Sequence, residues 1–190
     1  MLQSILQFHS NTTTDYIIKL VISIALLCIA GPVVITMSDQ MPITLQSLAV
    51  LFVSIAFGWR IGLPAVLIYL IAGGAGLPVF AGYRSGYNAF FGIYGGFFYG
   101  FIAAALISGY LAELEAFRKT IPAILNWFAG HLIILAFGGF WMMKFVPDEW
   151  LNNIKDVLPG AVIKSLAGAV LIDLIRRFLT RTRKTAFTED

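Results

Sequence analysis

One lysine inside an apolar segment is the residue of this chain most clearly suited to chemistry. Lys164 lies in the run 158–179, and one helical turn away stand Gly160, Ala161 and Gly168 rather than an acid. Holding an ammonium ion within a membrane helix costs roughly 2.5–3.5 kcal/mol, and less if the side chain reaches the interface. The lysine therefore either extends to the outer interface or acts as the counter-ion of an anionic ligand such as a carboxylate.

A second set of side chains could complete a binding site for such a ligand. Amides and hydroxyls suit a neutral ring that carries both hydrogen-bond donors and acceptors, and aromatic rings supply apolar walls. Each of these residues alone could equally serve packing or interfacial anchoring, but together they indicate a pocket for a small amphipathic acid. The polar members are Thr44, Gln46, Arg84 and Asn88, and the aromatic members are Tyr83, Tyr87, Phe90, Phe91 and Tyr94.

The stretch 70–101 is the element that must position many of these side chains. Of the 18 glycines in the chain, 9 fall between Gly73 and Gly100, and Pro78 interrupts them. Lipid offers no partners to bare backbone groups, so non-helical chain near a membrane is buried in protein or lines a cavity. An extracytoplasmic linker is the simpler interpretation, but linkers seldom carry so many aromatic residues beside Arg and Asn. The stretch is therefore predicted to fold over a pocket.

The composition places the whole chain in a membrane. Of its 190 residues, 59% are hydrophobic and 12% charged, and the mean hydropathy is +0.85. This charged fraction is about half that of a soluble domain. At about 20 apolar residues per span, the length allows roughly six transmembrane helices and no separate soluble domain. We expect an all-α membrane protein.

The apolar runs and the charge distribution give a topology. Counted by side, nine Lys and Arg residues fall on the side of the termini and four on the other, which predicts that both termini are cytoplasmic. The loops 37–45, 75–91 and 147–157 then share the outer face. The predicted parts are a polar N-terminal segment (1–15), one six-helix membrane domain (16–180) and a charged cytoplasmic tail (181–190). The six predicted spans are about 16–36, 42–57, 61–74, 92–112, 122–146 and 158–179.

Several classes of function lack support in the sequence. There is no GxxxxGK[ST] phosphate loop, no nucleophile–base arrangement and no cluster of metal ligands. His131 stands alone in its span, where a hydrogen-bonded packing role is favoured over a ligand or proton site. The basic residues are concentrated in a short tail rather than on a nucleic-acid-binding face. We therefore expect no enzyme activity, no cofactor, no metal and no nucleic-acid partner.

The fourth predicted span carries small residues every four positions, from Gly92 through Gly96, Gly100 and Ala104 to Ser108. Such spacing makes one helix face flat enough for close contact between backbones. Packing inside the bundle is the favoured explanation, and docking of a membrane partner is the alternative.

Four segments of the chain are more specific than generic membrane sequence. They are PITLQSLAVL at 42–51, GLPVFAGY at 76–83, GIYGGFFYGF at 92–101 and LPGAVIKSL at 158–166. These segments resemble the BioY family, the biotin-specific substrate-binding (S) components of energy-coupling factor (ECF) transporters. The similarity extends over about residues 15–180, and the segments occur in the family's order and spacing.

The resemblance implies a six-helix S-component fold in the cell membrane and high-affinity capture of biotin from the outer face. It also implies partners, namely a transmembrane coupling subunit and ABC-type ATPases, in addition to the lipid bilayer. By the same resemblance Lys164 is the anchor of the ligand carboxylate, and Asn88 is the candidate for the ureido ring. Tyr83, Arg84, Tyr87, Gln46 and Thr44 complete the expected substrate-binding set.

Two departures from the family pattern keep other functions open. Ala161 stands where the family usually has Asp, so one polar ligand contact is missing. This favours, as an alternative, an uptake subunit for another small carboxylic acid. No AxxxA docking pattern occurs in the first span, so contact with a coupling subunit could differ. A non-transporting membrane scaffold, assembled through the small-residue face of the fourth span, is the alternative from a different class.

Overall fold

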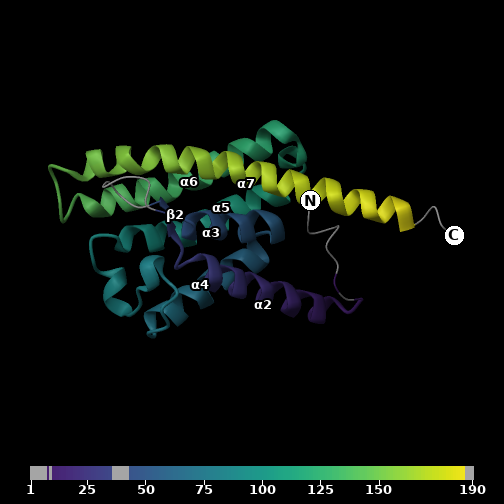
Figure 1. The fold of residues 1–190 in the computed structure, drawn as a ribbon, viewed down its shortest axis with the longest axis horizontal. Coiled ribbons are helices and arrows are strands. Elements are labelled where there is room, and N and C mark those ends of the chain that lie inside the picture. Colours follow the sequence, from purple (N-terminus) through teal and green to yellow (C-terminus); the bar gives the residue numbers. More distant parts are fainter. Residues whose placement is uncertain (1–7, 9, 36–42, 187–190) are drawn as a thin grey trace.

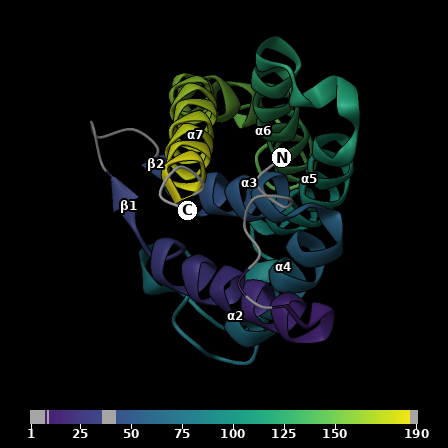
Figure 2. The ribbon, with the colours of Figure 1, turned by 90° about the vertical axis from the view of Figure 1, so that its right-hand side faces the viewer.

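The computed structural model describes residue 8, residues 10–35 and residues 43–186. This part of the chain is mostly helical and forms a bundle, in which α2 and α7 lie on opposite sides and α3 lies between them (Figures 1 and 2). The α-helices are α2 (Thr12–Ala30), α3 (Gln46–Phe57), α4 (Trp59–Gly74), α5 (Gly95–Glu113), α6 (Thr120–Met142) and α7 (Trp150–Ala186). The shorter elements are β1 (Val34–Ile35), β2 (Ile43–Thr44), η1 (Ala81–Tyr83), η2 (Tyr87–Phe90) and η3 (Glu115–Arg118).

The short helix α3 forms the centre of the bundle. Its sequence contains no charged residue, and it contacts α2, α4, α5, α6 and α7. Val50, Leu51 and Val53 are fully buried there. A helix that is apolar on all sides is stable in a protein interior or in lipid, and the contacts of α3 with five other helices place it in the interior of the bundle.

The small-residue face of α5 packs against α6. A Cβ atom added at Gly96 would meet the Cβ of Trp141 and the carbonyl oxygen of Phe137. One added at Gly100 would lie 3.0 Å from the Cα of Ile134. The glycines thus allow the two backbones to approach closely, and the predicted packing role inside the bundle is confirmed.

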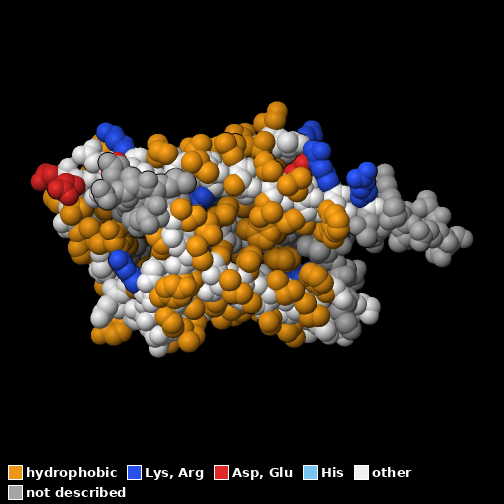
Figure 3. Space-filling model, in the orientation of Figure 1, with side chains coloured by type: hydrophobic (Ala, Val, Ile, Leu, Met, Phe, Trp, Pro, Cys, Tyr) orange, Lys and Arg blue, Asp and Glu red, His pale blue; other side chains and the backbone are white. Residues whose placement is uncertain are grey.

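The surface and the helix lengths are those of a multi-pass membrane protein. In the described part of the chain, four helical segments are long and apolar enough to cross a membrane, namely α2, α5, α6 and Trp150–Arg181 of α7; α3 and α4 are shorter apolar helices. Hydrophobic side chains cover most of the face seen in Figure 3, while most of the visible charged side chains lie toward its two ends. A broad apolar surface of this kind suits contact with lipid.

The second predicted span begins differently from expectation. It was expected to start as a helix near Pro42, but β2 pairs antiparallel with β1, Val34 opposite Thr44, and the helix begins at Gln46. The β-branched residues of these two strands favour extended backbone, which overrides the helical start. Most of the predicted loop 37–45 lies outside the described residues. The first and fifth predicted spans end early, at Ala30 and Met142.

The predicted outer loop 147–157 is largely helical, which corrects the last span. The helix α7 begins at Trp150 and contains Pro159 in its interior. Residues 151–157, which lie between the helix start and Pro159, include neither glycine nor proline. The helix therefore extends on the N-terminal side of Pro159 as far as Trp150. Lys164 therefore lies about 21 Å along the helix axis from its start, at ~1.5 Å per residue, rather than about 9 Å.

The helix α4 begins at Trp59, two residues before the predicted third span, and Pro64 lies in its second turn. A proline lacks the N–H that would pair with the carbonyl four residues earlier, here that of Arg60. The hydroxyl of Tyr16 on α2 donates to this carbonyl oxygen at 3.2 Å. A side chain from the neighbouring helix thus replaces the missing backbone hydrogen bond.

Candidate ligand-binding site

A cavity of about 600 Å³ lies between α3, α5, α6, α7 and the segment that connects α4 to α5. Its size is in the range of small-molecule sites, and its wall is mostly apolar, as in such sites. No Asp or Glu is found among the described residues that line it. The aromatic part of the wall consists of Phe80, Tyr94, Phe97, Phe98 and Phe101.

The segment between α4 and α5 folds over this cavity, and one buried aromatic side chain, that of Phe80, packs it against the bundle. Phe80 is 1% exposed, and its ring packs edge-on against Tyr69 and Phe90 and lies 4.6 Å from the ring of Phe98. Gly86, with φ of +94°, provides the turn that brings its N–H to the carbonyl of Gly73 at 2.8 Å. The prediction that this glycine-rich stretch forms part of a pocket is confirmed.

A hydrogen-bond chain fixes the same segment to α3 and α4. The amide nitrogen of Gln46 donates to the hydroxyl of Tyr69 at 2.8 Å, and this hydroxyl donates to the carbonyl of Val79 at 2.8 Å. Tyr69 is fully buried, so each of these polar groups depends on the others for a partner. The cavity wall at Gln46 is therefore coupled to the position of the covering segment.

Lys164 turns toward the end of β2 and the start of α3. Its ammonium group donates to the hydroxyl of Ser47 at 2.6 Å and to the carbonyl of Thr44 at 3.3 Å. No Asp or Glu of the described residues forms an ion pair with it. An ammonium group has three N–H donors, so one remains for a bound molecule. The residue forms part of the cavity wall.

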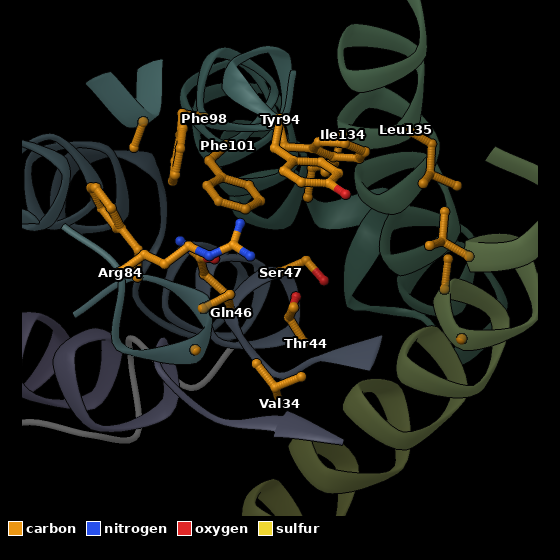
Figure 4. A pocket seen from close by; sticks show the side chains of 18 of the residues that line it. Val34, Thr44, Gln46, Ser47, Arg84, Tyr94, Phe98, Phe101, Ile134 and Leu135 are labelled. Atoms are coloured by element: carbon orange, nitrogen blue, oxygen red, sulfur yellow. The ribbon is translucent and has the colours of Figure 1, made fainter. Parts of the chain in front are cut away.

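Arg84 contributes a second positive charge to the cavity. It follows η1, and its guanidinium carbon lies 5.9 Å from the centre of the Tyr94 ring. Figure 4 shows its side chain reaching into the same hollow as those of Gln46 and Ser47. Two cations facing a mostly apolar cavity without a lining acid create a positive potential that favours an anionic ligand.

The structure brings together some of the sequence-predicted residues and not others. Lys164, Thr44, Gln46 and Arg84 all line the cavity. Asn88, Tyr83 and Tyr87 are exposed and lie outside its wall, with Tyr83 at 71% and Tyr87 at 68% exposure. Ligand contacts by any of the seven residues stay predictions.

Two polar side chains of the described cavity wall, those of Ser47 and His131, were not in the predicted set. Ser47, the partner of Lys164, gives no local signal in the sequence, because a serine in an apolar helix is common. His131 is visible as a lone intramembrane histidine and was assigned to packing. It does pack, with Nδ1 near the carbonyl of Trp127 and the hydroxyl of Ser165, but it also belongs to the wall.

Comparison with solved structures defines the fold. The fold matches a crystal structure of the S-component for biotin from an ECF-type ABC transporter, with a TM-score of 0.68 over 90% of this chain and 95% of the other. At 22% identity this likeness establishes the fold, which is that of an S-component.

Sequence comparison then gives the family. The model of the BioY family matches residues 4–181. The biotin transporter BioY2 of Lactococcus lactis is 32% identical over 172 residues, covering 90% of this chain and 93% of the relative. The biotin transporter BioY of Thermotoga maritima is 34% identical over 134 residues, covering 64% and 78%. The chain belongs to the BioY family.

Proposed function

We propose that this chain is the biotin-binding membrane subunit of an ECF-type vitamin uptake system in the cell membrane. The observation that carries the proposal is the cavity with Lys164 and Arg84 in its wall and no acid among its described lining residues. Biotin combines one carboxylate with an apolar chain and a polar ring, which this wall complements. Membership of the BioY family and the names of the relatives, which are biotin transporters, support the same ligand.

The proposed topology has six spans, both termini in the cytoplasm and one membrane domain over residues 16–180, between the segments 1–15 and 181–190. Figure 1 supports this arrangement, because the segment between α4 and α5 and the turn between α6 and α7 lie at the same end of the bundle. The C-terminal part of α7, with its basic residues, extends from the opposite end. Cationic ends remain in the cytoplasm, so the cavity end faces outward.

In the proposed complex the free N–H of Lys164 pairs with the valerate carboxylate. Hydrogen bonds to charged groups contribute on the order of 1.5–3 kcal/mol. Gln46, Thr44 and Arg84 lie around the same cavity and are available to the rest of the ligand. Asn88 and the exposed rings of Tyr83 and Tyr87 reach biotin only if the segments 75–91 and 37–45 close over it.

In this proposal the chain binds biotin, catalyses no reaction and uses no cofactor. It contains no phosphate loop, so energy for uptake comes from partners: a transmembrane coupling subunit and ABC-type ATPases.

A different small carboxylic acid is the second candidate ligand. Ala161 lies in the cavity wall and offers no polar side-chain atom, so the site carries one polar group fewer than the family pattern has. The scaffold hypothesis has lost its support, because the small-residue face on which it depended packs against α6.

Calorimetric titration of the detergent-purified protein with biotin tests the proposal, with lipoate as the control acid. We expect saturable binding of biotin and much weaker binding of lipoate. Absence of biotin binding would overturn the proposed ligand, and mass spectrometry of co-purified small molecules would then identify another acid.

A further inference from the structure

A second cavity of about 400 Å³, the α6–α7 groove, is lined mainly by residues of α6 and α7, with a few from α3, α5 and η3. None of its described lining residues belongs to the wall of the first cavity. The start of α6 and the basic end of α7 lie at the end of the bundle opposite the segment between α4 and α5 (Figure 1). The two cavities are therefore separate sites, toward opposite ends of the bundle.

Most of the α6–α7 groove is apolar, and its edge on α7 lies at the outside of the bundle. The floor contains the buried side chains of Ile55 and Trp127. Leu166, Val170 and Leu174 follow one another at intervals of one helical turn along α7, and each is about half exposed. Exposed apolar side chains on the outside of a membrane bundle meet lipid chains, so a hydrocarbon chain has direct access to the groove.

The length of the groove matches the depth of one lipid leaflet. At ~1.5 Å per residue, the lining part of α7 from Leu166 to Arg177 extends about 16 Å along the helix. Half of the hydrocarbon core of a bilayer is about 15 Å thick. With the arginine at the membrane interface, the apolar lining therefore reaches about as far as the middle of the bilayer.

Two arginines and one aspartate are the charged residues among the described lining of the groove. The Nη2 atom of Arg176 lies 3.0 Å from Oδ1 of Asp173, and Nε of Arg177 lies 2.6 Å from Oδ2. One carboxylate thus holds both guanidinium groups at the same end of the groove, where positive charge stays in excess. The Arg177 side chain is 76% exposed, and its terminal nitrogens carry further N–H donors.

These donors suit a phosphate group. The guanidinium group matches the geometry of phosphate oxygens, and for this reason arginine is a preferred residue for phosphate recognition. Thr120, the first residue of α6, lines the same groove, so the positive end of that helix dipole adds to the attraction for an anion. The groove therefore combines an apolar channel with an anion-binding end.

We propose that the α6–α7 groove binds one anionic phospholipid, with an acyl chain along the apolar lining and the phosphate beside Arg176 and Arg177. Basic pockets between membrane helices on the cytoplasmic side are typical sites for anionic headgroups. Free phosphate has no chain for the apolar lining, and a partner helix, about 10–12 Å wide, would cover the groove rather than enter it. The assignment to the cytoplasmic leaflet rests on the proposed topology, whereas the site itself does not depend on the ligand of the first cavity.

Native mass spectrometry of the full chain in a neutral detergent tests the proposal. Phosphatidylglycerol and phosphatidylcholine with identical acyl chains are added separately at equal concentrations, so that the two lipids differ in headgroup charge. We expect one phosphatidylglycerol per chain to be retained at lower concentration than phosphatidylcholine. Equal retention of the two lipids would contradict an anionic site. Dimers that retain no phosphatidylglycerol would show instead that a second copy of the chain covers the groove.

A charge-matched pair of variants locates the headgroup. Arg177→Gln should weaken phosphatidylglycerol binding about fivefold, the effect of one basic residue near an anionic headgroup. Arg60→Gln is the control, because Arg60 is also an exposed arginine paired with an acid, Glu113, but lies outside the groove wall. Both variants lose one positive charge. If they weaken binding equally, the attraction is non-specific and the assigned headgroup position is wrong.

A second pair of variants locates the acyl chain. Ala169→Leu places a larger apolar side chain in the groove wall and should reduce retention of phosphatidylglycerol, although both arginines are intact. Ala167→Leu is the control, because Ala167 is exposed on the same helix and outside the wall. Equal retention in the two variants would refute the position of the chain. If Ala169→Leu does not fold, the comparison of Arg177→Gln with Arg60→Gln decides.

The measurements separate this proposal from the proposed function, because none of them contains biotin. Loss of the lipid preference with intact biotin binding contradicts only the lipid site. Absence of biotin binding with a retained lipid preference contradicts only the proposed function.

Discussion

The Nζ atom of Lys164 lies 2.6 Å from the Oγ atom of Ser47, across 117 positions of the chain. This hydrogen bond joins α7 to the first turn of α3 at the cavity wall. It holds the ammonium group in place before a ligand arrives, and such preorganisation reduces the entropy lost on binding. The same bond explains how a lone cation is tolerated in an apolar bundle without an acid beside it.

The first prediction concerns this lysine. We expect Lys164→Ala to weaken biotin binding about ten- to hundredfold, because a charge-assisted hydrogen bond to a carboxylate is lost. Titration calorimetry of the purified variant measures the effect. Lys155→Ala is the matched control, because Lys155 is an exposed residue of the same helix that lies outside the cavity wall.

The bundle should remain folded in Lys164→Ala, because removing an unpaired charge from an apolar segment does not destabilise it. A thermal midpoint equal to that of the wild type checks this. Unchanged biotin affinity in the folded variant would show that the carboxylate is bound elsewhere, with Arg84 as the next residue to test.

The contrast between Lys164 and Ser47 shows what the sequence could reveal about the site. A lysine in an apolar run is a local anomaly and can be recognised without knowing the fold. Its serine partner cannot, because the pairing depends on how α3 and α7 pack. The same reason explains Asn88, which looks like a site residue by type but lies outside the cavity wall.

Some parts of the fold could be predicted from the sequence and others could not. The apolar runs of α2, α5 and α6 predict membrane helices, because they are long enough and apolar enough to cross a membrane. The pairing of β1 with β2 was not recognised, because two-residue strands leave no periodic pattern. The start of α7 was misplaced because the segment 147–157 was interpreted as an exterior loop, whereas the helix begins at Trp150 and contains Pro159 in its interior.

The hydroxyl of Tyr69 provides a second prediction. Tyr69→Phe removes the group that accepts from Gln46 and donates to the carbonyl of Val79, leaving both without this partner. We expect faster amide hydrogen exchange in residues 77–84 and biotin binding weakened about two- to tenfold, in keeping with one lost hydrogen bond. Tyr110→Phe is the control, since Tyr110 is 53% exposed on α5. Unaltered exchange in Tyr69→Phe would show that ring packing alone holds the segment.

The third prediction tests the contact between α5 and α6. In Gly96→Ala the new methyl group meets the Cβ of Trp141 and the carbonyl of Phe137, neither of which can rotate away. We expect a loss of about 1–3 kcal/mol in the free energy of unfolding, despite the higher helix propensity of alanine. Unfolding in mixed micelles with increasing denaturing detergent measures this loss. The control is Gly92→Ala, where the nearest atom is the carbonyl oxygen of Asn88 at 3.6 Å, and its stability should change little.

The last prediction concerns the ion pair near the start of α2. The ammonium group of Lys19 lies 2.6 Å from a carboxylate oxygen of Asp15, and the two side chains are only 7% and 13% exposed. Asp15→Asn leaves the buried ammonium without its carboxylate, which should lower the free energy of unfolding by about 3–5 kcal/mol. Adding Lys19→Met to that variant removes the stranded charge and should restore most of the stability, because an apolar side chain of similar length fits the same space.

The pair between Arg60 and Glu113 is the control for this prediction. Its atoms are 3.0 Å apart, but the arginine side chain is 69% exposed, so solvent screens the interaction. Glu113→Gln should therefore change the free energy of unfolding by no more than about 1 kcal/mol. Detergent-induced unfolding of the four proteins gives the comparison. If Asp15→Asn is as stable as Glu113→Gln, or if the double variant is no more stable than Asp15→Asn, the burial of Lys19 does not govern the stability of α2.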